Sequence, residues 1–276
     1  MQPTPSLPST DEILLGENLD LLPGFADEAF QLIYIDPPFN TGKEQTLKTL
    51  QTTPDEAGDR TGFNGRRYKT RLLEQSSYRD SFEDYLAFLA PRLEEAHRLL
   101  KSSGTLYFHI DWREAHYCKL LLDEVFGREA FLNEIVWAYD YGARTKRSWP
   151  KKHDTILVYV KDPADYFFDS QEVDREPYMA PGLVTAEKVE RGKLPTDVWW
   201  HTIVPTSGAE KTGYPTQKPE GIVRRMVQAS TREGDRCLDF FAGSGTLGAV
   251  AAALGRRYVL IDSNPEAVQV MRVRLG

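Results

Sequence analysis

Asp36 is followed by two prolines and an aromatic residue, Phe39, and this pattern suits one kind of chemistry. An amino group on an aromatic ring is a poor nucleophile, because its lone pair is delocalised into the ring. A carboxylate and a backbone carbonyl that both accept hydrogen bonds from the amino group localise this lone pair, and Asp36 and Pro37 offer the two acceptors. Consecutive prolines stiffen the backbone and hold both in place. Pro38 completes the rigid turn, and Phe39 offers a ring face on which a flat base can stack. Alone, the same residues also fit a strand-ending aspartate before a stiff turn.

A glycine turn is the second feature that could bind a ligand. Gly243-Ser-Gly245-Thr-Leu-Gly248 lies between a predicted strand and a predicted helix and satisfies G-x-G-x-x-G. The pattern fits a dinucleotide, S-adenosylmethionine or a plain turn. Asp239 precedes the first glycine by four residues, and its charge would repel a pyrophosphate but suits a ligand that carries an ammonium and a sulfonium. Asp262 can accept hydrogen bonds from ribose hydroxyls in either case. The turn favours S-adenosylmethionine and leaves NAD open.

Alternating strands and helices must position these motifs. The apolar run 31–35 predicts a buried strand that stops at Pro37. Helical spacing over 82–100 and 113–126 encloses a strand at 105–110, and two further strands are expected at 134–138 and 155–160. The final segment predicts helix 219–230, strand 236–240, helix 246–254, strand 258–261 and helix 265–274, and a strand and helix are expected within 11–22. This order is typical of an α/β fold with a doubly wound, mostly parallel sheet.

Three segments lack such a pattern. Residues 1–10 are rich in proline, serine and threonine, which predicts disorder. Residues 39–79 show little periodicity and are expected to form a long loop. Residues 162–214 are mixed and weakly patterned, which predicts a separate module or an elaborated insertion.

The charge is uneven along the chain. A net charge of −7 argues at face value against a nucleic-acid partner, but DNA contacts a local surface and not the average. Two basic runs also contain aromatic residues; either one alone is more typical of a solvated loop, but two in one acidic chain favour phosphate contact modestly. Their basic residues are Arg60, Arg66, Arg67, Lys69, Arg71 and Arg79 in the first run, and Arg144, Lys146, Arg147, Lys151 and Lys152 in the second.

The remaining bulk features exclude some classes of protein. The chain has 276 residues, of which 41% are hydrophobic and 27% charged, as in an ordinary globular protein. Its two cysteines lack metal-ligand spacing, so no metal is expected. It has neither a leader pattern nor an apolar stretch of membrane-spanning length, which predicts a cytoplasmic protein.

The order of the motifs carries a resemblance. Ile35-Asp-Pro-Pro-Phe-Asn-Thr-Gly42 comes first, Thr216-Gln-Lys-Pro219 follows, and the glycine turn comes last. In this circularly permuted order the chain resembles the β class of DNA amino-methyltransferases from about residue 13 to its end. It resembles especially the modification subunits of type III restriction systems and related solitary enzymes.

The resemblance implies a Rossmann-like methyltransferase sheet with an inserted target-recognition region. Residues 11–161 and 215–276 would form the catalytic domain, 162–214 the target-recognition region, and 43–79 a loop that contacts DNA. Asp36, Pro37, Pro38 and Phe39 would be catalytic. The S-adenosylmethionine site would comprise Asp239, Phe241, Gly243, Ser244, Gly245, Thr246 and Asp262, with Thr216 and Lys218 at the carboxylate of the cofactor and Glu17 and Asn18 at its adenine. DNA contacts would come from Arg66, Arg67, Lys69, Arg71, Arg79, Arg144, Lys146, Arg147, Lys151, Lys152, Trp199 and Lys211, with Trp200 and His201 as further candidates. Core packing is the more common role for the two tryptophans.

The implied function is site-specific methylation of the exocyclic amino group of a flipped base in duplex DNA. The aspartate at the head of the motif favours adenine N6. Cytosine N4 stays open because both reactions require the motif to activate an exocyclic amino group. A non-catalytic DNA- or nucleotide-binding subunit and an NAD-dependent oxidoreductase are the other readings. A restriction-enzyme counterpart and a homodimer are possible partners.

Overall fold

The computed structural model describes residues 11–40, 43–54, 60–61, 67–80, 82, 84–142, 144–205 and 208–276. Within 43–80 only the backbone of the strands is described. In the described part of the chain, no helix is both long and apolar enough to cross a membrane. The same residues contain no group of three or more His, Cys, Asp or Glu side chains that could hold a metal ion.

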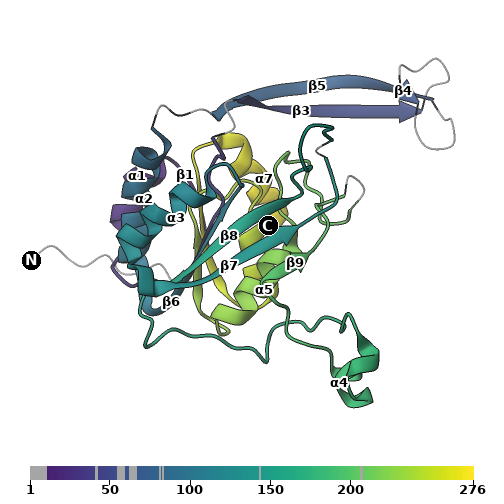
Figure 1. Cartoon of the computed structure of the whole chain (residues 1–276). Helices are drawn as coiled ribbons and strands as arrows, with labels where there is room; N and C mark the ends of the chain where they lie inside the picture. Colours follow the sequence, from purple (N-terminus) through teal and green to yellow (C-terminus); the bar gives the residue numbers. More distant parts are fainter. Residues whose placement is uncertain are drawn as a thin grey trace, which may run out of the picture.

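An eight-stranded sheet forms the centre of the molecule (Figure 1). Five neighbouring strands run parallel, the sixth is antiparallel to both of its neighbours, and the last strand is parallel to the seventh. The prediction of a mostly parallel α/β sheet is therefore confirmed. In spatial order the strands are β1 (Glu12–Leu15), β11 (Arg257–Asp262), β10 (Arg236–Asp239), β2 (Phe30–Ile35), β6 (Leu100–Ile110), β8 (His153–Val160), β7 (Phe131–Ala138) and β9 (Val198–Trp200).

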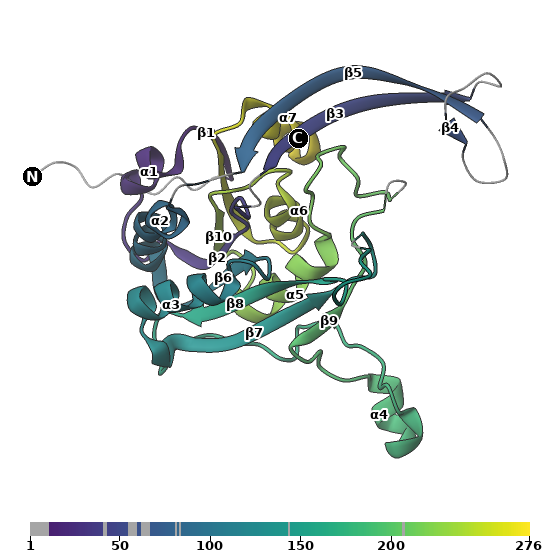
Figure 2. The same cartoon turned by 45° about the horizontal axis from the view of Figure 1, so that its top comes forward.

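Helices cover both faces of this sheet (Figures 1 and 2). Alternation along β2 explains how both faces become apolar, because Ile33 and Ile35 pack into one core cluster and Leu32 and Tyr34 into the other. The first cluster is completed by helices α2 and α3, and the second by α5, α6 and α7. The helices are α1 (Asn18–Leu21), α2 (Tyr85–Leu99), α3 (Ala115–Phe126), α4 (Ala186–Arg191), α5 (Glu220–Ser230), α6 (Thr246–Ala253) and α7 (Pro265–Leu275), with short 3-10 turns η1 (Leu22–Gly24), η3 (Arg128–Ala130) and η4 (Pro181–Leu183).

The order of the strands creates a switch point between β2 and β10. From β2 the chain continues to β6 on one side, whereas from β10 it continues through α6 to β11 on the other side. In open α/β sheets, ligands bind beyond the carboxyl ends of the strands at such a point. Asp36 follows β2 directly and Asp239 ends β10, so both lie at this edge, here called the carboxyl edge.

Residues 39–79 differ from their prediction as a long loop. The chain forms an antiparallel ribbon of β3 (Lys43–Pro54) and β5 (Arg67–Asp80), with the short β4 (Arg60–Thr61) beside β5. Lys43 pairs with Asp80, and Pro54 pairs with Tyr68. The prediction failed because it relied on an apolar face, whereas backbone pairing between polar, threonine-rich strands leaves no such signal.

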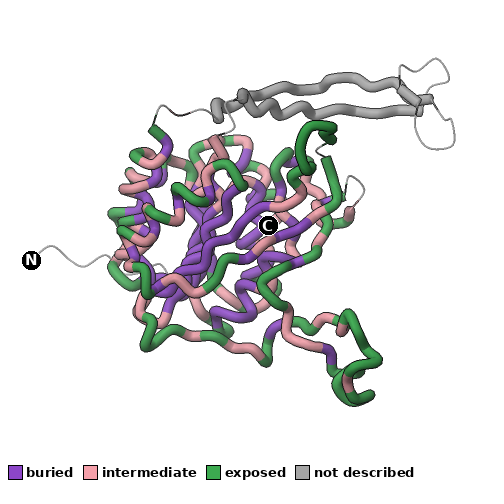
Figure 3. Tube along the Cα trace, viewed as in Figure 1, coloured by how far each residue is buried: buried purple, intermediate pink, exposed green. Residues whose placement is uncertain are grey.

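Residues 162–214 are partly joined to the central sheet. β9 pairs in parallel with β7 and becomes the edge strand. Earlier in the segment, α4 lies on an arm that projects from the body in Figures 1 and 2, and Figure 3 shows this arm as mostly exposed. The segment is therefore an elaborated insertion whose later part extends the sheet.

Candidate active site

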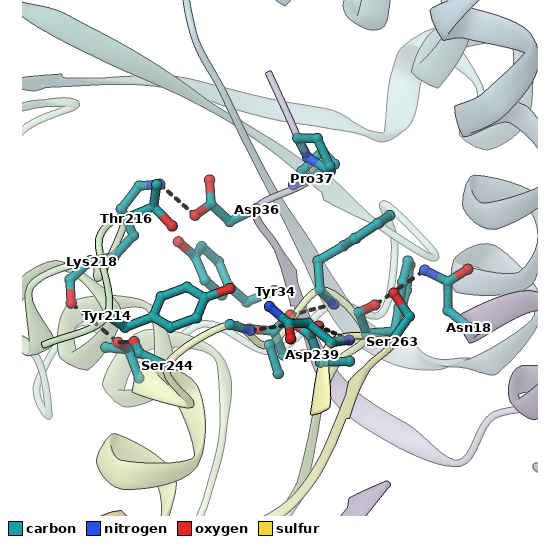
Figure 4. A pocket seen from close by; sticks show the side chains of 18 of the residues that line it. Asn18, Tyr34, Asp36, Pro37, Tyr214, Thr216, Lys218, Asp239, Ser244 and Ser263 are labelled. Carbon is teal, nitrogen blue, oxygen red and sulfur yellow. Dashed lines mark hydrogen bonds and ion pairs between the residues drawn. The ribbon is translucent and has the colours of Figure 1, made fainter. Parts of the chain in front are cut away.

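A pocket of about 500 Å³ opens at the carboxyl edge, at the switch point. Of the residues predicted to be catalytic or to bind the cofactor, every one except Gly245 lines it. In Figure 4, Asn18 lies at one end, Tyr214, Thr216 and Lys218 lie at the other, and Asp239 lies between them. The lining residues that the sequence did not suggest are Tyr34, Phe88, Tyr214, Phe240, Ala242, Ser263, Asn264 and Glu266.

The two carboxylate oxygens of Asp36 have different surroundings. Oδ2 forms an ion pair with the ammonium of Lys218. Oδ1 is buried and has no hydrogen-bond partner among the described residues. A buried acceptor without a partner is costly, and it indicates a place where a ligand donor belongs. The side chain of Asp36 is 16% exposed, so it is sheltered but still borders the pocket.

The turn that follows Asp36 is fixed from both sides. The hydroxyl of Tyr85 donates a hydrogen bond of 2.6 Å to the carbonyl oxygen of Pro38. Asn40 has a left-handed backbone with φ of 51°, which asparagine tolerates better than most residues. Its side chain donates to Glu114 at 2.9 Å and accepts from the backbone N–H of Phe82 at 3.1 Å. These bonds hold the proline pair rigidly at the pocket.

A buried polar network lies behind Asp36, and the sequence analysis did not identify it. His109 is fully buried on β6, with Nδ1 2.9 Å from the hydroxyl of Tyr34 and Nε2 3.3 Å from Oδ2 of Asp154. His109 Nδ1 also lies 4.0 Å from Asp36 Oδ1. The hydroxyl of Tyr139 donates to the other oxygen of Asp154 at 3.0 Å. The available signal was a histidine within the apolar end of β6 and an aspartate at the start of the largely apolar β8, because buried polar residues require partners.

Electrostatics set the protonation of two members of this network. Burial, reinforced by the negative charge of Asp36, raises the pKa of Tyr34 well above its usual value, so its hydroxyl stays protonated. Burial tends to raise the pKa of Asp154, but the hydrogen bond with His109, the charges of His109 and Lys218, and the hydrogen bond from Tyr139 together outweigh it, and the net pKa is lowered. Asp154 is therefore an anion that holds the imidazole in place.

The glycine turn between β10 and α6 needs its glycines for conformation and for space. Gly243 and Gly245 have φ of 49° and 73°, in the left-handed region that favours glycine. A Cβ on Gly248 would lie 2.6 Å from Leu260 Cδ1, so α6 can pack on β11 only with glycine there. A Cβ on Gly243 would lie 3.2 Å from the ring of Tyr214, which covers the turn. The backbone can thus approach a ligand closely.

Gly245 should be the least replaceable of these glycines. An alanine Cβ would lie 2.8 Å from Cγ of the buried Met271 and would also force a left-handed backbone on an L-residue. We expect Gly245→Ala to lower the free energy of unfolding by roughly 1–3 kcal/mol, measured by urea denaturation. Gly182→Ala is the matched control, because its Cβ would meet nothing within 4 Å. Equal stability of the two variants would contradict this packing.

Asp239 and Asp262 give the pocket an acidic floor. Asp239 Oδ1 accepts a hydrogen bond of 2.9 Å from the N–H of Phe241, and Asp262 Oδ2 accepts one of 2.8 Å from the N–H of Gly243. Burial raises the pKa of Asp239 well above its usual range, and the nearby charge of Asp36 adds to this effect. Burial also raises the pKa of Asp262, although N–H donors from Asn264 and Gly243 oppose it. Such a floor suits a cationic ligand and not a pyrophosphate.

Asn18 and Glu17 line the far end of the pocket, and they differ in whether their acceptor oxygens already have a partner. Asn18 is 5% exposed, and its amide nitrogen donates to the carbonyl of Phe240 at 3.2 Å. Its Oδ1 is buried with no hydrogen-bond partner in the described part of the chain, so it can accept from a ligand amino group. Glu17 is different, because its Oε1 already forms an ion pair with Nη2 of Arg92 at 2.5 Å.

The basic loop, here residues 144–152, joins β7 to β8 at the carboxyl edge. Ala138 pairs with His153, and His109 pairs with Ile156 on the neighbouring strand, so the loop emerges on the same edge as Asp36. Arg144, Lys146, Arg147 and Lys151 are exposed, and Lys152 is half-buried. Trp149 is 91% exposed. This end of the molecule can therefore meet a polyanion.

The other predicted DNA contacts have mixed outcomes. Trp199 is 6% exposed, and its indole N–H donates to the carbonyl of Thr196 at 2.7 Å. It packs in the second core cluster, which leaves little of its side chain for the DNA contact that was predicted. Trp200, the next residue on β9, is 73% exposed, and Lys211 donates to the carbonyl of Tyr214 at 3.3 Å. Arg66 and the side chains of Arg67, Lys69, Arg71 and Arg79 lie outside the described residues.

Comparison with known proteins gives the family. The family model N6_N4_Mtase, described as "DNA methylase", matches residues 30–272. The type II methyltransferase M.HpaI of Haemophilus parainfluenzae is 31% identical over 96% of this chain and 74% of its own length. The DNA adenine methyltransferase YhdJ of Escherichia coli K12 is 31% identical over 95% of this chain and 82% of its own length.

Solved structures agree on the fold. The crystal structure of the M1.HpyAVI–SAM complex superposes with a TM-score of 0.61 at 19% sequence identity, covering 96% of this chain and 98% of that one. The motif order, the pocket at the switch point and the family match over residues 30–272 agree with one another. The chain belongs to the N6/N4 family of DNA methylases, the enzymes that methylate amino groups of DNA bases.

Proposed function

We propose that this chain transfers a methyl group from S-adenosylmethionine to the N6 amino group of an adenine that has been flipped out of duplex DNA. The observation that carries the proposal is the position of Asp36, which borders a pocket with an acidic floor and presents a buried oxygen with no partner among the described residues. One group can thus orient an amino nitrogen beside a cationic methyl donor.

The pocket fits S-adenosylmethionine. Its volume of about 500 Å³ lies within the range of small-molecule sites, roughly 300–1,000 Å³. Asp239 faces the cationic part of such a ligand, and Asp262 offers acceptors for ribose hydroxyls. Asn18 Oδ1 offers an acceptor for an adenine amino group. When bound, the cofactor supplies an electrophilic methyl group on its sulfonium.

The residues of the chain then activate the acceptor. Asp36 and the carbonyl of Pro37 accept hydrogen bonds from the amino group and concentrate the lone pair on nitrogen, while Phe39 stacks on the base. As the nitrogen–carbon bond forms and the carbon–sulfur bond breaks, the nitrogen becomes positively charged. It then loses one proton, and the carboxylate of Asp36 is the nearest base that can take it on the way to water. No covalent enzyme intermediate is required.

Adenine is favoured over cytosine by two observations. The motif is headed by aspartate, and YhdJ, matched over most of both chains, is named a DNA adenine methyltransferase. Cytosine N4 remains the second candidate, because the family model spans N6 and N4 enzymes. Sequencing that maps modified bases in DNA from cells expressing the protein tests this directly. N6-methyladenine at one recognition sequence is the expected result. N4-methylcytosine at that sequence would identify cytosine, and not adenine, as the target base.

We further propose that duplex DNA lies across the carboxyl edge. The basic loop offers cations for phosphates, and the exposed Trp149 offers a ring face. The β3–β5 ribbon leaves the sheet directly after the catalytic turn and would contact DNA from the same edge. Residues 162–214 would contribute target recognition. The proposal also includes a restriction enzyme that acts as counterpart, assembly of the chain into a homodimer, and a cytoplasmic location.

Charge reversal in the basic loop should weaken DNA binding through the phosphates. We expect Lys146→Glu combined with Arg147→Glu to lower DNA affinity for all sequences. It should also reduce the slope of log affinity against log salt by about 1–2, as titrated by fluorescence anisotropy. The matched control is Arg128→Glu with Arg257→Glu, two exposed arginines at the amino ends of β7 and β11, on the opposite edge of the sheet. An equal loss in both double variants would argue against a DNA surface at the basic loop.

A further inference from the structure

Lys218 occupies an unexpected position. The sequence analysis assigned it to the carboxylate of the cofactor, but its ammonium forms an ion pair with Asp36. The same ammonium lies 4.8 Å from the centre of the Phe39 ring, within the range of a cation–π contact. Lys218 thus contacts both groups that the proposed mechanism reserves for the target base.

These contacts imitate those of the base. An N–H donor of the ammonium meets the carboxylate that would accept from the amino group of adenine, and the positive charge lies over the ring on which adenine would stack. Lys218 holds Oδ2 and leaves Oδ1 without a partner among the described residues, so a base would compete with the ammonium for the face of Phe39 and for the space beside Asp36. In the observed conformation, the base site is closed by a residue of the protein itself.

The main chain of Lys218 lies in the other half of the pocket. Its carbonyl oxygen accepts a hydrogen bond of 3.1 Å from the hydroxyl of Thr246, the first residue of α6. The side chain therefore begins beside the glycine turn and ends at Asp36, spanning the space between the cofactor residues and the catalytic residues. Since the side chain is only 12% exposed, its charge requires an anionic partner inside the pocket.

We propose that Lys218 is a switch that couples the two binding sites, an inference that rests on the proposed function. With the pocket free of cofactor, the ammonium pairs with Asp36 and excludes the base. The carboxylate of a bound cofactor offers a second anion next to α6 and draws the ammonium away from Asp36. Asp36 and Phe39 then become available, so that cofactor binds before the base. The coupling is reciprocal, so a change that weakens only the ion pair between Asp36 and Lys218 should strengthen cofactor binding.

Isothermal titration calorimetry without DNA tests this coupling. The probes are S-adenosylhomocysteine, which carries the amino-acid tail but no sulfonium, and 5′-deoxy-5′-methylthioadenosine, which lacks the tail. We expect Asp36→Asn to increase the affinity for S-adenosylhomocysteine by roughly 5-fold to 10-fold and to leave the affinity for methylthioadenosine unchanged. Lys218→Met should weaken S-adenosylhomocysteine, and adding Asp36→Asn to it should bring no further gain.

The outcomes separate the switch from the proposed function. Unchanged or weaker S-adenosylhomocysteine binding by Asp36→Asn would overturn the switch and leave the methyltransferase proposal intact. A wild-type protein that binds neither probe would overturn both. A second readout uses a duplex with 2-aminopurine at the mapped target base. The wild type should raise its fluorescence only with S-adenosylhomocysteine present, whereas Lys218→Met should do so without it. Thermal unfolding checks that each variant is folded. If Lys218→Met does not fold, the binding measurements on Asp36→Asn alone decide the test.

Discussion

Replacement of Asp36 by asparagine is expected to slow methyl transfer by about 10³-fold while cofactor binding is retained. Removing one preorganised hydrogen-bonding group from an active site typically lowers the rate by roughly 10²–10³-fold, and Asp36 combines this role with that of proton acceptor. Asparagine keeps the size and one acceptor oxygen but loses the charge. The loss should therefore fall on the rate of the chemical step and not on the assembly of the pocket.

Single-turnover transfer from tritiated S-adenosylmethionine to DNA containing the mapped site measures this rate. Asp20→Asn is the matched control, because it makes the same exchange at an exposed position on α1 outside the pocket. An Asp36→Asn enzyme that transfers methyl groups at the wild-type rate would refute the assigned mechanism.

Asp239→Asn is expected to have opposite effects on binding and on stability. The carboxylate of Asp239 borders the part of the pocket where the ammonium and sulfonium of the cofactor would lie, and a charge-assisted contact contributes roughly 1.5–3 kcal/mol. The variant should therefore bind S-adenosylmethionine about 10-fold to 100-fold more weakly. Asparagine can still accept the hydrogen bond from the N–H of Phe241, so the turn itself should persist.

The effect of Asp239 on stability has a defined dependence on pH. Its pKa is raised in the folded protein, first by burial, so the folded state binds the proton more tightly than the unfolded state does. Stability without cofactor is then lost as the pH rises from the unfolded pKa, about 3.9, through the raised folded pKa. Asp239→Asn removes this loss, and the melting temperature of the cofactor-free variant should exceed that of the wild type by roughly 2 °C or more near neutral pH.

Thermal unfolding at about pH 4 and about pH 7 tests the sign. The advantage of the variant should be present at the higher pH and small at the lower one. A variant that is less stable than the wild type at neutral pH would show that the charge of Asp239 does not destabilise the folded protein.

The sequence predicted the parts of the site that are local in the chain. β2, β10 and β11 were expected as buried strands, and each ends at or before a pocket aspartate because parallel strands bring their carboxyl ends to one edge. The glycine turn was predictable for the same reason, since positive φ and close packing leave few alternatives to glycine.

The long-range contacts could not be predicted from spacing. Asp36 and Lys218 are 182 positions apart, and no periodic pattern indicates that one pairs with the other. His109 lies between apolar residues of β6, and Asp154 precedes the strand predicted at 155–160, so only the burial of both side chains reveals that they form a network. Trp199 was expected at DNA because the resemblance placed residues 162–214 in a target-recognition region, but alternation on β9 points it into the core and leaves Trp200 outside.

The most direct measurement incubates the purified protein with S-adenosylmethionine and unmodified DNA, digests the DNA, and quantifies modified nucleosides by mass spectrometry. We expect N6-methyladenine to accumulate with the wild type and to be nearly absent with Asp36→Asn. Accumulation of N4-methylcytosine alone would contradict adenine as the target. Formation of neither nucleoside by a folded protein that binds the cofactor would contradict the assignment of Asp36, Pro37 and Phe39 to amino-group methylation.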